Sequence, residues 1–206
     1  PDWLARHRAR HAAGETVVGG AVALRGSNYW AQSDNVSMFH EFVPGLPAGA
    51  RRLLPTLNLS LRREMFAAVG GMDESFPGAA AEDADWTIRI RRAGHRLWFD
   101  PAAVVAHAPA RTTWADVVRH WRNLGHNAVR VRLRYPAEFG TPGGARHAWW
   151  WRLLSPLIAA RVTVGVYAKR PLWPHWPSLP VVYVTKMIYC FGAARSIDIG
   201  FATSDE

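Results

Sequence analysis

Short apolar runs, separated by polar segments with glycine and proline, dominate the first part of the chain. Residues 16–24 are mostly valine, alanine and glycine, and this run predicts a buried strand. The arginine- and histidine-rich residues before it predict a polar helix. Residues 58–61 predict a short extended segment, whereas residues 43–51, with two prolines and two glycines, predict a loop. These residues therefore contain both helical and extended segments.

Two short helical patterns follow. Residues 63–69 predict a brief helix, which the glycine pair at 70–71 ends by supplying a left-handed cap position. Residues 82–94 predict a second helix that ends at its terminal glycine. Its first turn is acidic and its later turns carry arginines, an arrangement that the helix dipole favours.

The pattern then changes from strand to a long helix. Residues 97–99 and 102–106 predict two strands joined by an Asp-Pro turn at 100–101. From about residue 112 to residue 135 apolar side chains recur at helical spacing, with arginines at other positions. This predicts a long amphipathic helix that ends before Pro136.

The C-terminal residues form two interrupted apolar stretches, 149–168 and 181–194. Neither supplies the ~20 uninterrupted apolar residues that a membrane-spanning helix needs. Five of the 11 tryptophans lie between residues 149 and 176, near arginines, and segments at membrane interfaces have this composition. A packed helical hairpin explains the same pattern, so the sequence leaves both interpretations open.

The formal net charge of +9 lies in one block of the chain. Residues 111–170 hold 11 Lys and Arg against 2 Asp and Glu; residues 1–110 hold 12 against 11, and residues 171–206 hold 2 against 3. Such a block favours an anionic partner, for example a membrane surface, although a solvated basic face explains it too. We expect no nucleic acid partner, because no helix-turn-helix or zinc signature accompanies the basic helix.

Cys190 is the only cysteine, which excludes intrachain disulfides and cysteine-based zinc sites. A lone cysteine fits a reducing compartment. We therefore expect a cytoplasmic protein, and the basic, tryptophan-rich C-terminal residues leave peripheral attachment to the inner face of a membrane open as an alternative.

Four motifs follow one another in a fixed order. They are Asn58-Leu59-Ser60-Leu61, Val69-Gly70-Gly71-Met72-Asp73-Glu74, Glu82-Asp83-Ala84-Asp85-Trp86 and Val104-Val105-Ala106-His107. Singly each is weak, but in this order and spacing they resemble the C-terminal, acceptor-side half of family 2 glycosyltransferases of the GT-A fold. The resemblance covers about residues 15–135. It implies a partial, Rossmann-like α/β nucleotide-diphospho-sugar transferase fold that lacks its N-terminal nucleotide-binding half.

The resemblance also implies an activity, inverting transfer of a sugar, of the hexosyltransferase type, from a nucleotide-sugar donor to a hydroxyl. The acceptor would be a glycan, a lipid or another hydroxyl compound, such as a precursor of a cell-envelope glycan. The nucleotide-binding strands and the Asp-x-Asp metal motif of the family are not found in these residues. We therefore expect the chain alone to be catalytically inactive.

The family's general base corresponds to Asp83, and inversion by direct displacement needs one such carboxylate opposite the leaving group. At a helix start we expect its pKa to be held low. Glu82 would contact the acceptor or the donor sugar beside it. The other residues implied in sugar binding are Asn58, Asp85 and Trp86, although Asp85 lies on another side of the helix, where a structural role competes.

His107 matches a position at which related enzymes hold a divalent metal or a diphosphate. A neutral imidazole suits Mn²⁺ better than Mg²⁺, and the resemblance implies one of these two ions. Three arginines of the basic block are candidates for the leaving diphosphate, because guanidinium presents a fork of donors. They are Arg111, Arg119 and Arg122.

These expectations divide the chain into residues 1–135, the acceptor-side part of a transferase domain, and residues 136–206, a helical, membrane-facing or packing region. A different class of function remains open. A binding module without catalysis would use its arginines and tryptophans to dock on an anionic membrane surface or polymer.

Overall fold

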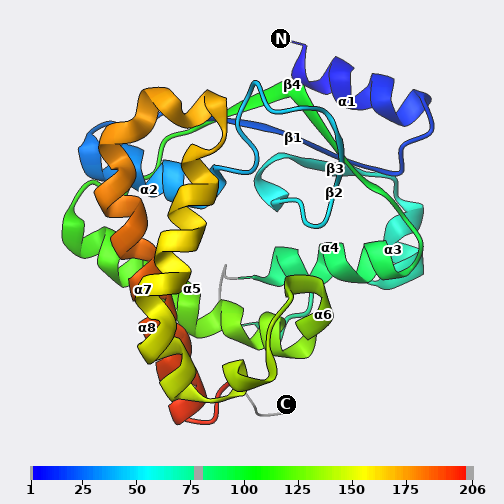
Figure 1. The fold of residues 1–206 in the computed structure, drawn as a ribbon. Helices are drawn as coiled ribbons and strands as arrows, with labels where there is room; N and C mark the ends of the chain where they lie inside the picture. The colour runs from blue at the N-terminus through cyan, green and yellow to red at the C-terminus, as the bar shows by residue number, and fades with distance from the viewer. Residues whose placement is uncertain (1, 77–80, 203–206) are drawn as a thin grey trace. The chain divides into compact units, whose positions relative to one another are not determined.

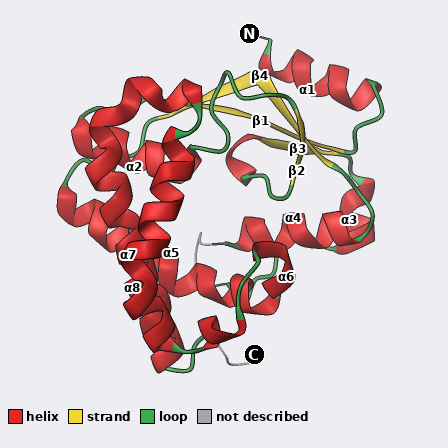
Figure 2. Cartoon of the chain, viewed as in Figure 1, coloured by secondary structure: helices red, strands yellow, loops and turns green. Residues whose placement is uncertain are grey.

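The computed structural model describes residues 2–76 and 81–202. The chain forms two compact units, each made of separate segments. The first contains residues 1–24, 41–74 and 82–107, and the second contains residues 25–40, 75–81 and 108–206. Both contain helices, but the sheet lies in the first unit (Figures 1 and 2).

The sheet of the first unit has four strands in the order β2-β4-β1-β3. They are β1 (Val17–Leu24), β2 (Gly49–Arg51), β3 (Leu59–Leu61) and β4 (Leu97–His107). The two long strands, β1 and β4, are parallel, and the two short ones pair antiparallel at the edges. This mixed sheet confirms the α/β class, and β1 and β3 confirm two predicted strands. The loop expected at 43–51 is wrong at its end, where β2 forms.

β4 is a single strand, so the prediction of two strands with a turn at Asp100-Pro101 is wrong. The pairing with β1 shifts register between Gly20 and Ala21, opposite this dipeptide, and continues beyond it. Proline lacks a backbone donor and is tolerated in a strand at such an irregularity. The Asp100 carboxylate accepts the N–H of Ala102 at 3.0 Å, which satisfies the backbone there.

Helices cover both faces of the sheet in the first unit. They are α1 (Trp3–Ala12), the 3₁₀ turn η1 (Thr56–Asn58), α3 (Glu64–Val69) and α4 (Glu82–Arg92). α3 and α4 pack against one face through a buried core of eight side chains: Val17, Ala21, Leu54, Met65, Trp86, Ile90, Leu97 and Phe99. α1 covers the opposite face (Figure 1). There Arg10 lies over the Trp98 ring and pairs with Asp100 at 2.7 Å.

The predicted helix ends are confirmed at two glycines. Gly70 follows α3 with φ of 73°, and Gly94 follows α4 with φ of 92°. Positive φ values are costly for residues with a Cβ atom, so glycine stops both helices where the sequence indicated.

The second unit is helical. It contains α2 (Tyr29–Phe39), α5 (Trp114–Arg134), α6 (Pro136–Phe139), η2 (Gly143–Arg146), α7 (Ala148–Tyr167), η3 (Arg170–Ser178) and α8 (Leu179–Asp198). α8 packs against α2, α5 and α7. Glycines allow its backbone to approach α5, because a Cβ added at Gly192 would lie 2.2 Å from the Arg122 carbonyl oxygen. The long helix before Pro136 is confirmed as α5, with Thr113 as its N-cap.

α2 was not predicted, because its inward face is polar. Asp34 is fully buried, and its carboxylate accepts Arg111 Nε at 2.7 Å and Trp121 Nε1 at 2.9 Å. Ser37 and Thr185 share a buried hydrogen bond of 2.8 Å. A helix that buries polar pairs has no apolar periodicity to reveal it.

The two units divide the chain elsewhere than at the predicted boundary of 135/136. α5 packs on α8, so it belongs with the C-terminal helices rather than with the sheet. α7 and α8 pack side by side as the hairpin that one interpretation of the sequence required (Figure 1). Within the described residues, no helix combines the length and apolarity needed to cross a membrane.

Candidate functional site

The start of α4 gathers acidic side chains in the first unit. Glu82, Asp83 and Asp85 all lie in the first turn, where a helix N-terminus favours negative charge. Ala81, immediately before it, has φ of 75°, a left-handed value that costs a non-glycine residue about 1–3 kcal/mol. Strain of this kind concentrates at functional sites, where the surrounding structure imposes it.

Three members of the α4 motif hold the helix in place. Asp85 is fully buried and its carboxylate accepts Arg89 Nε at 2.8 Å. The same guanidinium donates to the carbonyl oxygens of Val69 and Gly71, at 2.5 and 2.7 Å. Trp86 is 3% exposed, and its Nε1 donates to the carbonyl oxygen of Gly70 at 2.9 Å. Asp85, Trp86 and Arg89 therefore fasten α4 to the segment that follows α3.

Asp83 and Glu82 take no part in that fastening. The Asp83 carboxylate accepts the N–H of Ala84 at 2.7 Å and a backbone hydrogen bond from Thr56 of η1. Glu82 has a buried oxygen, Oε2, without a hydrogen-bond partner among the described residues. A buried carboxylate oxygen left unpaired is costly, which is typical of a site kept for a ligand rather than for stability.

Burial raises the pKa of Asp83 above its ordinary value of 3.8, and the adjacent Glu82 charge raises it further. The expectation of a lowered pKa at a helix start is therefore wrong. Backbone hydrogen bonds do lower it, but the loss of water around the carboxyl outweighs them.

Asn58 lies in a buried hydrogen-bond network. Its side chain is 1% exposed. The amide nitrogen donates to the carbonyl oxygens of Ala21 and Ala103, at 2.9 Å each, and the amide oxygen accepts from Trp3 and His7. Asp85 and Trp86 are buried in the contacts above. The role of these three residues in sugar binding stays a prediction.

His107 ends β4, in register with Leu24, and is half-buried. The part of the chain that the structure describes contains no group of three or more His, Cys, Asp or Glu side chains able to hold a metal.

The three arginines predicted to bind diphosphate belong to the second unit. Arg111 holds the buried Asp34, and Arg119 donates to Asp116 at 3.0 Å. Arg122 is exposed on α5.

One contact of the site was missed by sequence reasoning. Thr56 reaches Asp83 through its backbone N–H, two residues before Asn58. Any residue except proline supplies such a donor, so no side-chain signal existed. The contact joins the 3₁₀ turn that leads into the Asn-x-Ser segment to the Glu-Asp motif within one unit.

Several curated proteins are similar to this chain at modest identity. A pre-mycofactocin glycosyltransferase of Mycobacterium tuberculosis is 30% identical over 126 residues, which are 60% of this chain and 26% of the relative. The succinoglycan biosynthesis protein ExoA of Rhizobium meliloti is 32% identical over 108 residues, 51% of this chain and 28% of that protein. The probable glycosyltransferase YdaM of Bacillus subtilis is 29% identical over 93 residues, which are 42% of this chain and 20% of that protein. These relatives support a glycosyltransferase family.

The chain spans about a quarter of the length of these relatives. No protein-family model matches it, and no solved structure matches it significantly. Glycosyl transfer is thus supported by sequence relatives, and the α4 carboxyl pair supplies chemistry that fits it. A carboxylate with a raised pKa, set beside a second carboxyl group, is suited to accept a proton from a hydroxyl.

A stability measurement separates the two kinds of acid in α4. Asp83→Asn should stabilise the chain at neutral pH, because it removes a buried charge while Asn keeps an oxygen for the Ala84 N–H. The pKa of Asp83 is higher in the folded chain than in the unfolded chain. The free energy of unfolding of the wild type therefore falls as the pH rises above the ordinary value of 3.8, and it stays at this lower level above the folded-state pKa. The gain should therefore shrink as the pH falls towards about 4.

Asp85→Asn is the matched control, since the charge change and helix turn are the same. It breaks the pairing of a buried carboxylate with Arg89 and should cost about 2 kcal/mol. Thermal unfolding at neutral and acid pH measures both variants. Destabilisation by Asp83→Asn at neutral pH would make Asp83 a structural cap.

Proposed function

We propose that this chain is the acceptor-side part of an inverting, family 2-like glycosyltransferase of GT-A type, with Asp83 as general base. The observation that supports it most is the carboxyl pair at the start of α4. Two neighbouring acids are left out of the network that holds the helix, and one has a pKa raised by burial. Two of the relatives are named glycosyltransferases, which supports glycosyl transfer as the class of reaction.

In the proposed reaction the acceptor hydroxyl lies against Asp83. As its oxygen forms a bond to the anomeric carbon of the donor, its proton passes to the Asp83 carboxylate. The bond from that carbon to the diphosphate oxygen breaks on the opposite side, and the nucleoside diphosphate leaves with the electron pair. One displacement inverts the anomeric configuration. Glu82, whose buried Oε2 has no hydrogen-bond partner among the residues that the structure describes, would accept a hydrogen bond from a sugar hydroxyl.

The described residues do not form a metal site by themselves, because they contain no cluster of three suitable ligands. His107 supplies one imidazole at the end of β4. The proposal therefore includes Mg²⁺ or Mn²⁺ with its main ligands outside this chain and His107 as one contributor. No step above depends on it.

The remaining partners of the proposal follow from the reaction. The donor is a nucleotide sugar, and the acceptor is a glycan or another hydroxyl compound. Arg111, Arg119 and Arg122 stay candidates for the diphosphate, and the first two also pair with Asp34 and Asp116. The reaction takes place on the cytoplasmic side, where nucleotide sugars are expected, with the nucleotide-binding part supplied outside these residues.

The test is the stereochemistry of the product. The full-length protein that contains this chain is incubated with a panel of nucleotide sugars and hydroxyl acceptors, and the new glycosidic bond is assigned by NMR. We expect an anomeric configuration opposite to that of the donor. Retention would contradict the single displacement. The 206-residue chain should give no product with the same panel, since a base without a positioned electrophile contributes little.

A further inference from the structure

The outer face of α7 in the helical unit is apolar and exposed. Trp149, Leu153, Leu157 and Val164 have 58, 69, 68 and 71% of their surfaces accessible. Their spacing of four, four and seven places them along one side of the helix. The inner side of the same helix buries Trp151, Ser155, Ala159 and Thr163 instead. We call these four exposed side chains the α7 face.

This distribution corrects the expectation that Trp149, Trp150 and Trp151 act together at a membrane interface. Trp151 is 4% exposed and donates from Nε1 to the Ala145 carbonyl oxygen at 2.8 Å. Trp150 is half-buried and packs edge-on against it. Only Trp149 of the three faces outward.

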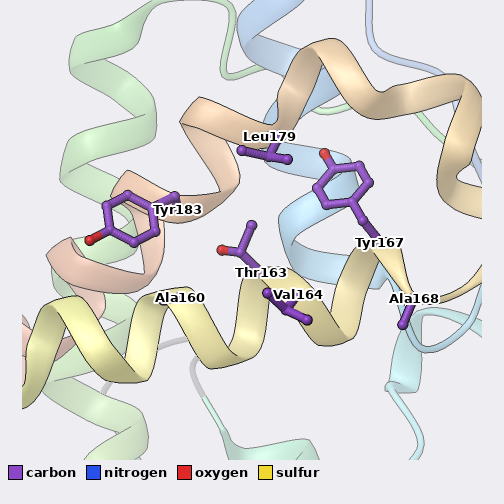
Figure 3. Close-up of a pocket in the computed structure, with 7 residues that line it drawn as sticks. All are labelled: Ala160, Thr163, Val164, Tyr167, Ala168, Leu179 and Tyr183. Carbon is purple, nitrogen blue, oxygen red and sulfur yellow. The ribbon is translucent and has the colours of Figure 1, made fainter.

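An apolar pocket adjoins the α7 face (Figure 3). It has a volume of about 520 Å³, within the usual range of ligand pockets, and Val164 belongs to both features. The other lining residues are Ala160, Thr163, Tyr167, Ala168, Leu179 and Tyr183. Thr163 Oγ1 is buried there without a hydrogen-bond partner among the described residues. A recess whose lining is mostly apolar suits a hydrocarbon chain better than a polar ligand.

The segment that joins α7 to α8 adds two exposed tryptophans, Trp173 and Trp176, at 57 and 70%. Each is flanked by proline or leucine in η3. Tryptophan prefers the boundary between water and lipid headgroups, where its ring is buried and its N–H stays wet.

The positive charge around the α7 face indicates which kind of partner binds there. Residues 139–197 contain no Asp or Glu and carry seven Lys and Arg, of which Arg152 pairs with Asp198 just beyond this range. Arg161 is exposed on α7, four residues after Leu157 and three before Val164. A second copy of the chain would set like charges against each other, whereas anionic headgroups complement them.

We propose that the α7 face docks on an anionic lipid bilayer and that the adjoining pocket takes one lipid acyl chain. The helix lies in the plane of the headgroups, with its leucines below them and Arg161 at the level of the phosphates. This docking is independent of the chemistry at Asp83, so either can fail without the other.

Flotation of the 206-residue chain with vesicles of equal parts phosphatidylcholine and phosphatidylglycerol tests the surface. We expect co-flotation at low salt, and much weaker binding to pure phosphatidylcholine. The double variant Leu153→Glu, Leu157→Glu should bind about 100-fold less, because it removes two apolar contacts and adds two negative charges. Its control, Leu4→Glu, Leu57→Glu, makes the same change at exposed leucines of the first unit and should bind as wild type.

The electrostatic part has its own pair of variants. Arg161→Gln should weaken binding about fivefold, the value of one basic residue at an anionic surface. Arg8→Gln removes an exposed arginine from α1 and should have no effect. Circular dichroism of each variant confirms that it is folded.

Site-specific labels test the pocket, and the buried Cys190 leaves introduced cysteines as the reactive ones. Fluorophores at Leu157→Cys and at Ala160→Cys should both be quenched by vesicles whose acyl chains carry a doxyl group, and one at Leu4→Cys should not. Quenching at 157 without quenching at 160 would overturn the acyl-chain site. Failure of folded wild type to float, or wild-type binding by the double variant, would overturn the docking surface itself. A dimer broken by the double variant, without vesicle binding, would do so as well.

Discussion

Asp83→Asn in the full-length protein should lose sugar transfer by about 10²–10⁴-fold while donor binding is kept. Asn preserves the shape of the side chain and its hydrogen bond with Ala84, but it cannot accept the proton of the acceptor hydroxyl. The loss should appear in kcat rather than in donor affinity, because the carboxylate acts only as the proton leaves. Single-turnover transfer and donor titration measure the two quantities separately.

The control for this experiment is Glu64→Gln. Glu64 is also an acid in the first turn of a helix of the same unit, but its side chain is exposed and pairs only loosely with Arg62, at 3.8 Å. Its replacement should leave transfer within about twofold, since exposed ion pairs contribute little. Transfer at the wild-type rate by Asp83→Asn would remove Asp83 as the base. The docking surface on α7 would be unaffected by that result.

Asn58→Leu should destabilise the first unit by about 3–5 kcal/mol, the largest stability effect that we expect. The substitution is similar in size but leaves two strand carbonyls, of Ala21 and Ala103, and the donors of Trp3 and His7 without their partner. Each buried group left unpaired costs about 1–3 kcal/mol. Urea unfolding measures the change.

Asn123→Leu is the matched substitution, at an exposed position of α5. Its effect should stay within about 0.5 kcal/mol, as for most surface changes. A small effect of Asn58→Leu would mean that the network around Asn58 is satisfied in another way, and would reopen a ligand-binding role for this residue.

The sequence predicted the elements that have local signals. β1 follows from a short apolar run, α5 from helical periodicity and the proline after it, and the ends of α3 and α4 from single glycines. Each depends on side chains close together in the chain. The Glu-Asp motif was placed correctly at a helix start for the same reason.

The errors arose where distant contacts decide. Asp100-Pro101 has the composition of a turn, but pairing with β1 keeps the chain extended. The pKa of Asp83 depends on how much water the surrounding chain removes, which no local pattern contains. α2 is hidden because Asp34 finds its partner, Arg111, 77 residues away. Adjacent tryptophans have the same residue type, and only helix packing distinguishes Trp149 from Trp151.

The chain passes between its two units at five points, 24/25, 40/41, 74/75, 81/82 and 107/108. No single cut therefore yields two complete parts. Removal of everything after residue 107 would leave α2 without α8, its main partner, and its buried Asp34 without Arg111 and Trp121. Deletion from the other end would take α1 and β1 before reaching any boundary of the helical unit. The sheet and the helices of these residues therefore cannot be separated by truncation, and neither unit can be produced alone from one continuous segment.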